Sequence, residues 1–311
     1  MADKKVDIGV VIINYNNATL TKESVLSVLT STNVAIDLQI VVVDNASEKE
    51  DYLNLRNSIS QINDARVKLV RSVINTGFGG GNMFGVQHLN ARFYAFINND
   101  TLLQNDCLTI LKNHLDSNSE TGLLGPQILD ENLNPKVSFD HFVSLSREIL
   151  GSGFLELINS KKYPNRKKEH TNPLQVNYVN GSFIFCRASS FNEVGGFDTN
   201  LFLFFEESDL SYRLLKNGSA TYFVPEAKYI HYQGKSMPSS IATKLELKTS
   251  MFYVIRKHQG YLSYQLLRLL FLIRYGLTSI LKPKYWSLFY RILIGMPLSK
   301  SLKMKQKIMK D

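Results

Sequence analysis

Three carboxylates stand directly behind an apolar and aromatic run in the stretch FLFFEESDL, residues 202–210. Carboxylates are rarely buried without a partner, so Glu206, Glu207 and Asp209 call for an explanation. A clustered, partly desolvated carboxylate holds a proton more tightly than usual, which suits a general base. The structural alternative is that acidic residues gather in the first turn of a helix and complement its macrodipole. That alternative explains one or two carboxylates, and not the aromatic residues before them.

Polar residues also end four apolar runs of the N-terminal half. They are Asn14, Tyr15 and Asn16 after the first run, Asp44 and Asn45 after the second, Asn75 to Asn82 after the third, and Asn98, Asn99 and Asp100 after the fourth. In open α/β sheets, ligands bind beyond the carboxyl ends of the strands, so all four groups are expected to face one cleft. Any one of them taken alone is equally explained as a turn, because Asn and Asp favour turns.

The third of these groups is glycine-rich. NTGFGGGNMFG, residues 75–85, has four glycines in five positions, which permits close approach of the backbone to a phosphate at a helix N-terminus. No Gly-Lys-Ser/Thr follows, and the loop comes after the third strand, so neither a Walker loop nor a dinucleotide fingerprint fits. A flexible turn is the alternative.

The fourth group, INND at residues 97–100, ends in a single carboxylate. Mg²⁺ and Mn²⁺ sites commonly use one or two carboxylates together with substrate phosphates, so Asp100 is a candidate anchor for a divalent cation. An Asn-Asp turn is the simpler explanation of the motif by itself.

The elements that must position these residues alternate along the chain. Near-continuous β-branched runs predict buried parallel strands over residues 6–13, 38–44, 66–72 and 92–98, with helices between them. Later strands are expected over 122–129 and 176–187, and helices over 106–117 and from Glu206 to a stop at Gly218. Ser47 and Glu50 have the spacing of a capping box. This alternation predicts a doubly wound α/β sheet.

Charge and cysteine content restrict the setting. Residues 240–311 hold 14 Lys and Arg against 2 Asp and Glu, and the whole chain carries +9, so residues 1–239 carry a net charge of −3. The basic segment is therefore expected to meet a polyanionic surface, and an anionic membrane fits better than nucleic acid because no nucleic-acid-binding motif accompanies it. The two widely spaced cysteines indicate a reducing compartment, and the N-terminal apolar run is too short for a signal peptide.

The ordered motifs resemble those of family 2 inverting glycosyltransferases with a GT-A fold, in particular the bacterial rhamnosyltransferase-like branch. The resemblance covers about residues 7–236 and rests on VVIINYN, VVVDNAS, NTGFGGGNMFG, INND, the segment from VNGSFIFCR to FFEESDLSYRLLKNG, and HYQGKS. It implies a Rossmann-like, doubly wound mixed sheet with a helical C-terminal extension. The implied domains are a GT-A catalytic domain over 1–239, divided into a nucleotide-sugar half (1–125) and an acceptor half (126–239), and a basic helical region over 240–311.

The resemblance also assigns roles to residues. It implies that Tyr15 and Asp44, with Asn14 and Asn16 beside them, hold the nucleoside, and that Asn75, Gly77 and Asn99 lie near the pyrophosphate. Asp100 and His231 would bind Mn²⁺ or Mg²⁺, and Gly181 and Ser182 would lie where the acceptor approaches. Glu207 takes the position of the catalytic base, flanked by Glu206 and Asp209, and the choice between the two glutamates stays open. Glu stands where the family more often has Asp, and the family's DXD motif is reduced to NND.

The basic tail contains an amphipathic stretch, residues 261–281, that includes Arg268 and Arg274. Its apolar stripe, with both arginines off it, favours a helix lying on the membrane surface over a spanning one; the stripe consists of Leu262, Leu266, Leu269, Ile273, Leu277 and Ile280. Trp286 and Tyr290 are expected at headgroup depth, and Lys300, Lys303, Lys305, Lys307 and Lys310 near anionic lipid. The alternative is that the stripe packs on the catalytic core or on another subunit, as in a homodimer.

The sequence thus predicts an inverting, metal-assisted glycosyltransferase at the cytoplasmic face of the bacterial cell membrane. The expected donor is dTDP-rhamnose, with a UDP-hexose as the alternative, and the expected acceptor is a lipid-linked saccharide or polysaccharide. A sugar nucleotidyltransferase would be expected to place a basic, glycine-rich phosphate loop after the first strand, where this chain has NYNNATL. A non-catalytic membrane-binding protein would explain the tail alone.

Overall fold

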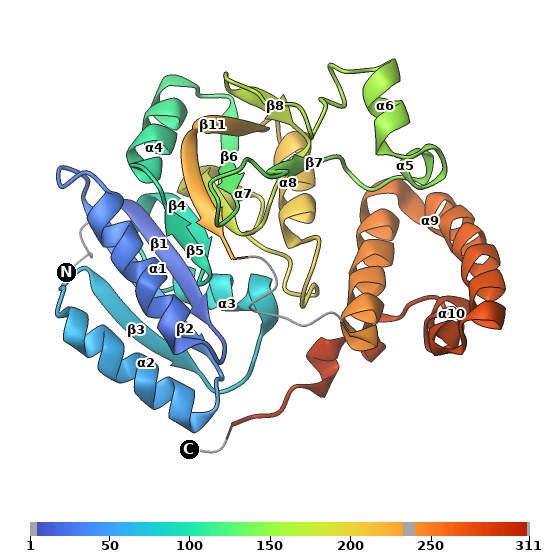
Figure 1. Cartoon of the computed structure of the whole chain (residues 1–311), viewed down its shortest axis with the longest axis horizontal. Coiled ribbons are helices and arrows are strands. Elements are labelled where there is room, and N and C mark those ends of the chain that lie inside the picture. The colour runs from blue at the N-terminus through green and yellow to red at the C-terminus, as the bar shows by residue number, and fades with distance from the viewer. Residues whose placement is uncertain (1–4, 233–239, 310–311) are drawn as a thin grey trace.

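A nine-stranded mixed sheet forms the centre of the computed structural model, which describes residues 5–232 and 240–309. The strand order is β3-β2-β1-β4-β10-β6-β11-β5, with β8 paired to β11, and helices cover both faces (Figure 1). The strands are β1 (Val6–Asn14), β2 (Leu38–Asn45), β3 (Val67–Ser72), β4 (Ala91–Asn98), β5 (Thr101–Leu103), β6 (Thr121–Leu129), β7 (Phe139–Asp140), β8 (Leu174–Val176), β9 (Tyr178–Val179), β10 (Phe183–Arg187) and β11 (Ala220–His231). The helices are α1 (Ala18–Ser31), α2 (Lys49–Ile62), α3 (Gly77–Val86), α4 (Cys107–Ser117), α5 (Leu145–Leu150), α6 (Ser152–Ile158), α7 (Ala188–Glu193), α8 (Glu206–Lys216), α9 (Ile241–Leu281) and α10 (Trp286–Leu293).

The first four predicted strands form the parallel half of the sheet. Strand β1 pairs in parallel with both β2 and β4, and β2 pairs in parallel with β3. Their β-branched runs are buried on both faces, as expected of strands covered by helices on each side. The register places Asn14 beside Asp44 at the carboxyl ends, so the polar residues after these strands share one edge.

The other half of the sheet mixes directions. Strand β10 runs antiparallel to both β4 and β6, and β11 runs parallel to β6. The predicted α/β fold with a doubly wound mixed sheet is therefore confirmed. The antiparallel β10 brings the segment before it, including Gly181 and Ser182, to the carboxyl end of β4: the Asn98 amide donates to the Ser182 carbonyl at 2.9 Å.

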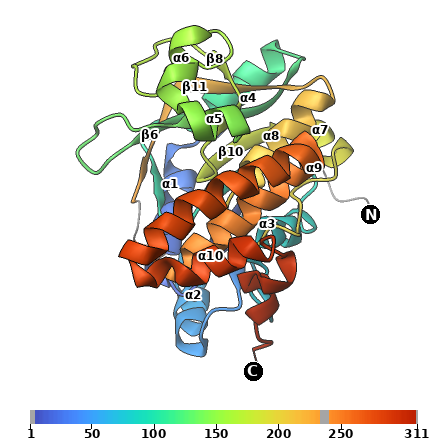
Figure 2. The same cartoon turned by 90° about the vertical axis from the view of Figure 1, so that its right-hand side faces the viewer.

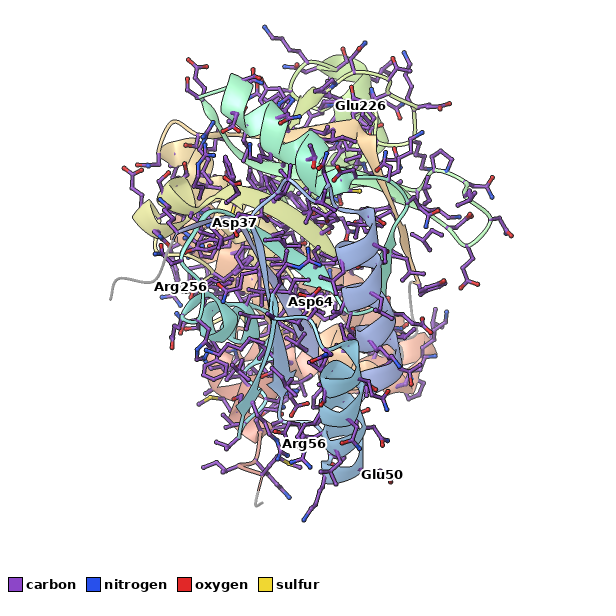
Figure 3. The ribbon with its side chains drawn as sticks, turned by 90° about the vertical axis from the view of Figure 1, so that its left-hand side faces the viewer. Asp37, Glu50, Arg56, Asp64, Glu226 and Arg256 are labelled. Carbon is purple, nitrogen blue, oxygen red and sulfur yellow. The ribbon has the colours of Figure 1, made fainter. Side chains whose placement is uncertain are left out.

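One predicted helix start is wrong in its detail. Helix α2 begins after Glu48 without a side-chain cap, although Ser47 and Glu50 have capping-box spacing. The Ser47 hydroxyl instead accepts from the Asn16 backbone amide and from the Asn14 side chain, both at 2.9 Å. A tertiary contact has taken the oxygen that a local cap would use. The outer side of α2 carries exposed charged side chains such as Glu50 and Arg56 (Figure 3).

The C-terminal region is helical, as predicted. Helix α9 is bent at Gly260, whose φ of 85° is outside the helical range, so its two halves diverge and α10 packs against them (Figure 1). A separate core fills this region and includes Phe252, Leu267, Phe271 and Ile292. No helix within the described part of the chain is long and apolar enough to cross a membrane.

The end of the chain returns to the part of the protein that contains the sheet. The Met309 amide donates to the Val73 carbonyl at 2.7 Å, and the Lys303 ammonium donates to the Thr199 carbonyl. Just before Lys303, the Ser301 hydroxyl donates to the buried Glu246 carboxylate of α9 at 2.6 Å. At least part of the basic tail therefore lies along the protein.

Candidate active site

The nucleoside end of the predicted site is a connected polar cluster. Asp44 is fully buried, accepts from Asn14 at 3.1 Å and pairs with Arg71 at 3.3 Å. Asn14 is also fully buried and accepts from Thr21 at 2.7 Å, and Thr21 in turn accepts from the Asn99 amide at 3.0 Å. Residues after β1, β2 and β4 thus meet as predicted.

Tyr15 and Asn16, which follow Asn14, face differently. Tyr15 is half exposed beside the cluster. Asn16 has a φ of 53° and accepts from the Glu48 amide at 2.7 Å through its side-chain oxygen, which fixes the turn after β1. Asn16 therefore shapes the loop that presents Tyr15.

The glycine-rich loop is held by Asn45. Its side chain donates to Asn75 and to the Gly77 carbonyl, both at 3.1 Å, and accepts from Thr76. Gly77 has a φ of 75°, and a Cβ there would lie 2.1 Å from the Phe202 carbonyl oxygen, so only glycine fits. The adjoining Phe78 amide donates to the same carbonyl at 3.0 Å. The start of α3 is thereby attached to the segment that carries the three carboxylates.

Asp100, which follows β4, and His231, which ends β11, lie next to each other. The His231 Nε2 atom lies 3.3 Å from Asp100 Oδ1, and the Tyr232 amide donates to the Asp100 carbonyl at 2.9 Å. His231 Nδ1 is buried without a hydrogen-bond partner in the part of the chain that the structure describes. The rest of HYQGKS, from Gln233 onward, lies outside the described residues.

Two side chains are enough for the predicted kind of cation. Within residues 5–232 and 240–309 there is no group of three or more His, Cys, Asp or Glu side chains that could hold a metal. Mg²⁺ typically uses one or two carboxylates and takes its other ligands from water and substrate phosphates. Asp100 and His231 therefore fit a cation that a bound diphosphate completes, and they do not form a self-sufficient metal site.

The two glutamates of FEESDL point to different neighbours. Glu207 is partly buried beside Gly181, where a built Cβ would lie 3.5 Å from the Glu207 carboxyl carbon. Glu206 is buried, and its Cγ lies 3.6 Å from a Cβ built at Gly79 in the glycine-rich helix. Glu207 thus faces the segment leading into β10, and Glu206 faces α3.

Both carboxyls hold their protons more tightly than usual. Burial raises the pKa of Glu207 to about 7, and the charge of Asp140 adds to the shift. Burial raises the pKa of Glu206 well above its ordinary range, with the negative charge of Glu207 as the second cause. One Glu206 oxygen has no hydrogen-bond partner among the described residues. A carboxyl with a pKa near neutrality is suited to proton transfer at physiological pH.

Asp209, the third carboxylate, is used differently. It is fully buried and accepts from His258 at 2.7 Å, with Lys257 at 2.7 Å and Arg213 at 2.8 Å as ion-pair partners. Burial opposes its ionisation, but the His258 hydrogen bond and the cationic partners hold the pKa of Asp209 below its ordinary value. Asp209, which the sequence predicts to flank the base, therefore connects α8 to α9 through its contacts with Lys257 and His258.

A pocket of about 340 Å³ opens beside Glu207, between α5, α8 and α9. Its lining includes Asp140, Arg147, Tyr178, Phe205, Glu207 and Lys248. The sequence alone does not point to these residues, apart from Glu207. Asp140 and Tyr178 lie in two-residue strands, Arg147 lies in the six-residue α5, and Lys248 is one of several lysines of α9. No local signal distinguishes them from surface residues.

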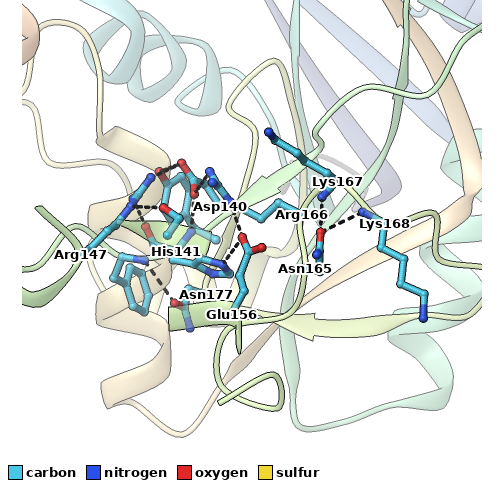
Figure 4. A network of polar contacts seen from close by, with 12 residues as sticks. Asp140, His141, Arg147, Glu156, Asn165, Arg166, Lys167, Lys168 and Asn177 are labelled. Atoms are coloured by element: carbon cyan, nitrogen blue, oxygen red, sulfur yellow. Dashed lines mark hydrogen bonds and ion pairs between the residues drawn. The ribbon is translucent and has the colours of Figure 1, made fainter. Parts of the chain in front are cut away.

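Ion pairs fasten one wall of the pocket. Asp140 binds Arg147 at 2.7 Å and Arg166 at 2.6 Å, and Arg166 also binds Glu156 at 3.0 Å (Figure 4). The Glu156 carboxylate also lies 3.2 Å from Nε2 of the fully buried His141. The polar segment over residues 161–173 is thus anchored beside the pocket through Arg166.

Comparison with known proteins agrees with this arrangement. The sequence model of Glycosyl transferase family 2 matches residues 9–195, which is more than half of the chain. The chain belongs to glycosyl transferase family 2. A solved structure of GalNAc-T7 with UDP, GalNAc and Mn²⁺ shares the fold, with a TM-score of 0.60 over 82% of this chain and 48% of that one at 18% identity.

Two relatives of this family 2 protein are rhamnosyltransferases. It is 29% identical to the N-acetylglucosaminyl-diphospho-decaprenol L-rhamnosyltransferase of Mycobacterium tuberculosis over 150 residues, 45% of this chain and 47% of that one. It is also 29% identical to the rhamnosyltransferase WbbL of Escherichia coli K12 over 191 residues, 58% of this chain and 71% of that one. The chain therefore spans about half the length of the mycobacterial relative. The resemblance to family 2 and to its rhamnosyltransferases is confirmed.

Proposed function

We propose that this family 2 protein is an inverting glycosyltransferase that moves L-rhamnose from dTDP-rhamnose to a lipid-linked saccharide. The carrying observation is that Glu207, with its raised pKa, lies beside Gly181 at the edge of the sheet that also bears Asp100. The names of both relatives support rhamnose, and the name of the mycobacterial relative supports a lipid diphosphate acceptor. A UDP-hexose donor for the same chemistry is the second candidate.

In the proposed mechanism, Glu207 accepts the proton of the acceptor hydroxyl. The hydroxyl oxygen then attacks the anomeric carbon of the donor as the bond to the diphosphate breaks, and the diphosphate leaves with the electron pair. Asp100 and His231 would hold a Mn²⁺ or Mg²⁺ ion, which stabilises charge on the leaving diphosphate when bound. Asn75, Gly77 and Asn99 orient the donor from the opposite side. Attack opposite the leaving group inverts the anomeric centre.

We further propose that the protein works at the inner face of the cell membrane. The predicted apolar stripe of α9 is exposed to solvent: Leu262 is 73% exposed and Leu277 64%, and the opposite side of the helix packs inward through Leu267 and Phe271. Packing of the stripe on the catalytic core is therefore wrong, and a second subunit stays the alternative. Helices α5, α6 and α10 lie on the same face as the second half of α9 (Figure 2).

A donor panel tests the proposed reaction. Purified protein is offered dTDP-rhamnose and UDP-hexoses with a lipid diphosphate-linked monosaccharide, with Mn²⁺ or with a chelator. The proposal predicts turnover of dTDP-rhamnose that is lost on chelation and restored by added Mn²⁺. Turnover of a UDP-hexose alone would select the second donor. Turnover of neither, with no thermal shift by dTDP or UDP, would contradict the enzymatic proposal.

A further inference from the structure

One cation in the pocket beside Glu207, Lys248, has no ion-pair partner among the residues that the structure describes. Lys248 lines this pocket from the first half of α9. Its ammonium lies 4.3 Å from the Phe271 ring centroid and 3.7 Å from the Met251 sulfur. Within the described ranges it forms no ion pair; Glu148, a carboxylate that lines the same pocket, attracts it without an ion-pair contact.

This arrangement disfavours the charged state of Lys248. Burial lowers the pKa of its ammonium, and Arg274 nearby adds repulsion, against a weaker opposing attraction from Glu148. Partly buried lysines of purely structural role are usually paired, because an unpaired ammonium loses hydration without compensation. An anion that enters the pocket would supply the missing partner.

Among the other charged groups that line the pocket, Arg147 and Asp140 pair with each other, whereas the Glu148 and Glu207 carboxyls form no ion pair within the described residues. Arg147 donates to Asp140, and Asp140 and Glu156 share Arg166 (Figure 4). Arg147 is further committed to the His141 carbonyl and to Ser152. Lys248 is therefore the cation of this pocket that is available to a ligand.

The position of Lys248 links the base to the exposed apolar face. The residue lies beyond positions 9–195, which match the family model, so it belongs to the C-terminal extension of this chain. Helix α5 contacts α9 at the pocket. Both continue into elements with exposed apolar side chains, which are Phe154, Leu157 and Ile158 of α6 and the stripe of α9.

We propose that Lys248 binds a phosphate of the lipid diphosphate that carries the acceptor sugar, while Glu207 faces the acceptor hydroxyl. This inference rests on the proposed glycosyl transfer. An ammonium offers three hydrogen-bond donors to phosphate oxygens, and the charge-assisted contact strengthens where water is excluded. The sugar would lie between the two side chains, with the lipid extending toward the apolar face.

The test compares Lys248→Met with Lys244→Met. Methionine keeps an unbranched side chain that can contact Phe271, and Lys244 is an exposed lysine one turn earlier on the same helix. For a short-chain prenyl diphosphate-linked monosaccharide, Lys248→Met is expected to raise KM by about ten-fold or more, the order of a lost charge-assisted hydrogen bond. KM for the matching methyl glycoside, which lacks the phosphates, and for the donor should stay unchanged, as should all three values in Lys244→Met.

A binding measurement separates this inference from the proposed reaction. The dissociation constant of geranyl diphosphate is measured by calorimetry in the three proteins, so no turnover is needed. A loss of about ten-fold in affinity in Lys248→Met alone supports the assignment even if the donor is misidentified. Equal affinity in all three proteins, or equal KM changes with the methyl glycoside, would overturn it. Thermal unfolding of Lys248→Met should show no loss of Tm, because the substitution removes an unpaired charge.

Discussion

At the residue scale, adjacent glutamates in one helical turn acquire different roles from their surroundings. Glu207 reaches the pocket and Gly181, whereas Glu206 is buried against the glycine-rich helix. Because a general base must contact the acceptor hydroxyl, the pocket favours Glu207. The direction of each side chain therefore supports Glu207 in the choice that the sequence leaves open, and our proposal assigns the base to Glu207.

The pH dependence of turnover should report the Glu207 carboxyl. Its pKa of about 7 means that the carboxyl is protonated in acid and becomes an acceptor for a proton only as the pH rises. We therefore expect kcat/KM to increase through neutral pH and to level off in mild alkali. In a Glu207→Asp variant, the pH at which kcat/KM increases should shift, while the shape of the profile stays the same. A profile that is flat between pH 5.5 and 8 would exclude the carboxyl as the titrating base.

The same group should affect stability in the opposite sense. Between its ordinary pKa of 4.5 and about 7, the unfolded chain has lost the Glu207 proton and the folded protein retains it, so folding is progressively disfavoured as the pH rises. Glu207→Gln cannot ionise. We expect its Tm relative to the unsubstituted protein to be higher at pH 8 than at pH 5. A Tm difference that does not depend on pH would contradict this electrostatic assignment.

At the element scale, the turn before α8 is held in an unfavourable backbone conformation. Phe204 and Phe205 both have positive φ values, 73° and 69°, which are uncommon for bulky residues. Such conformations cost of order 1–3 kcal/mol each and persist where surrounding contacts enforce them. Here the contacts are the Phe78 amide on the Phe202 carbonyl and the Ser250 hydroxyl, which donates to the Leu203 carbonyl at 2.7 Å. Helices α3 and α9 together set the direction of Glu207.

Gly77 is the position at which this coupling is most sensitive. Gly77→Ala would bring a Cβ against the Phe202 carbonyl at a φ of 75°, so we expect a loss of about 1–3 kcal/mol in unfolding free energy. Donor affinity should fall as well, because the loop moves. Gly153→Ala in α6 meets no atom within 4 Å and should be neutral or slightly stabilising. Urea unfolding and dTDP titration measure both; equal stability of the two variants would contradict the close contact.

The limits of sequence-based prediction follow from whether a signal is local. The β-branched runs before Asn14, Asp44 and Asn98 predict the parallel strands because burial on both faces leaves a continuous apolar pattern. The prediction that Ser47 caps α2 is wrong because its hydroxyl accepts from the Asn16 amide in the turn after β1, which is distant in sequence. The sequence does not point to the pocket residues Arg147 and Lys248, because they come from α5 and α9, which are far apart along the chain and meet only in the folded protein.

At the scale of the whole molecule, several helices that bear exposed apolar side chains lie on one face. That face carries α6, the second half of α9 and α10, and includes the half-exposed Trp286 and the exposed Tyr290 (Figure 2). Apolar surface beside basic residues is typical of proteins that lie on anionic membranes. Of the lysines predicted to contact lipid, Lys303 is already engaged within the protein, because its ammonium donates to the Thr199 carbonyl. The apolar face is therefore the main candidate for membrane contact.

Introducing negative charge into this apolar face should release the protein from anionic lipid. Leu269 and Ile273 are 56% and 58% exposed, so Leu269→Glu with Ile273→Glu should leave Tm nearly unchanged and strongly reduce sedimentation with phosphatidylglycerol vesicles. Val34→Glu, in an exposed loop of the catalytic half, is the control and should sediment normally. Undiminished sedimentation of the double variant would contradict the assignment of this face. A change from dimer to monomer instead would support the subunit alternative.

The most direct test of the account is turnover and donor binding in Glu207→Gln and Glu206→Gln, measured side by side with saturating Mn²⁺. Removing the base should lower kcat in Glu207→Gln by about 10²–10⁴-fold, the usual contribution of general base catalysis, while the Kd for dTDP stays within a small factor. Glu206→Gln, beside the glycine-rich helix, should retain far more activity. Full turnover in Glu207→Gln, or a loss confined to Glu206→Gln, would contradict the central claim.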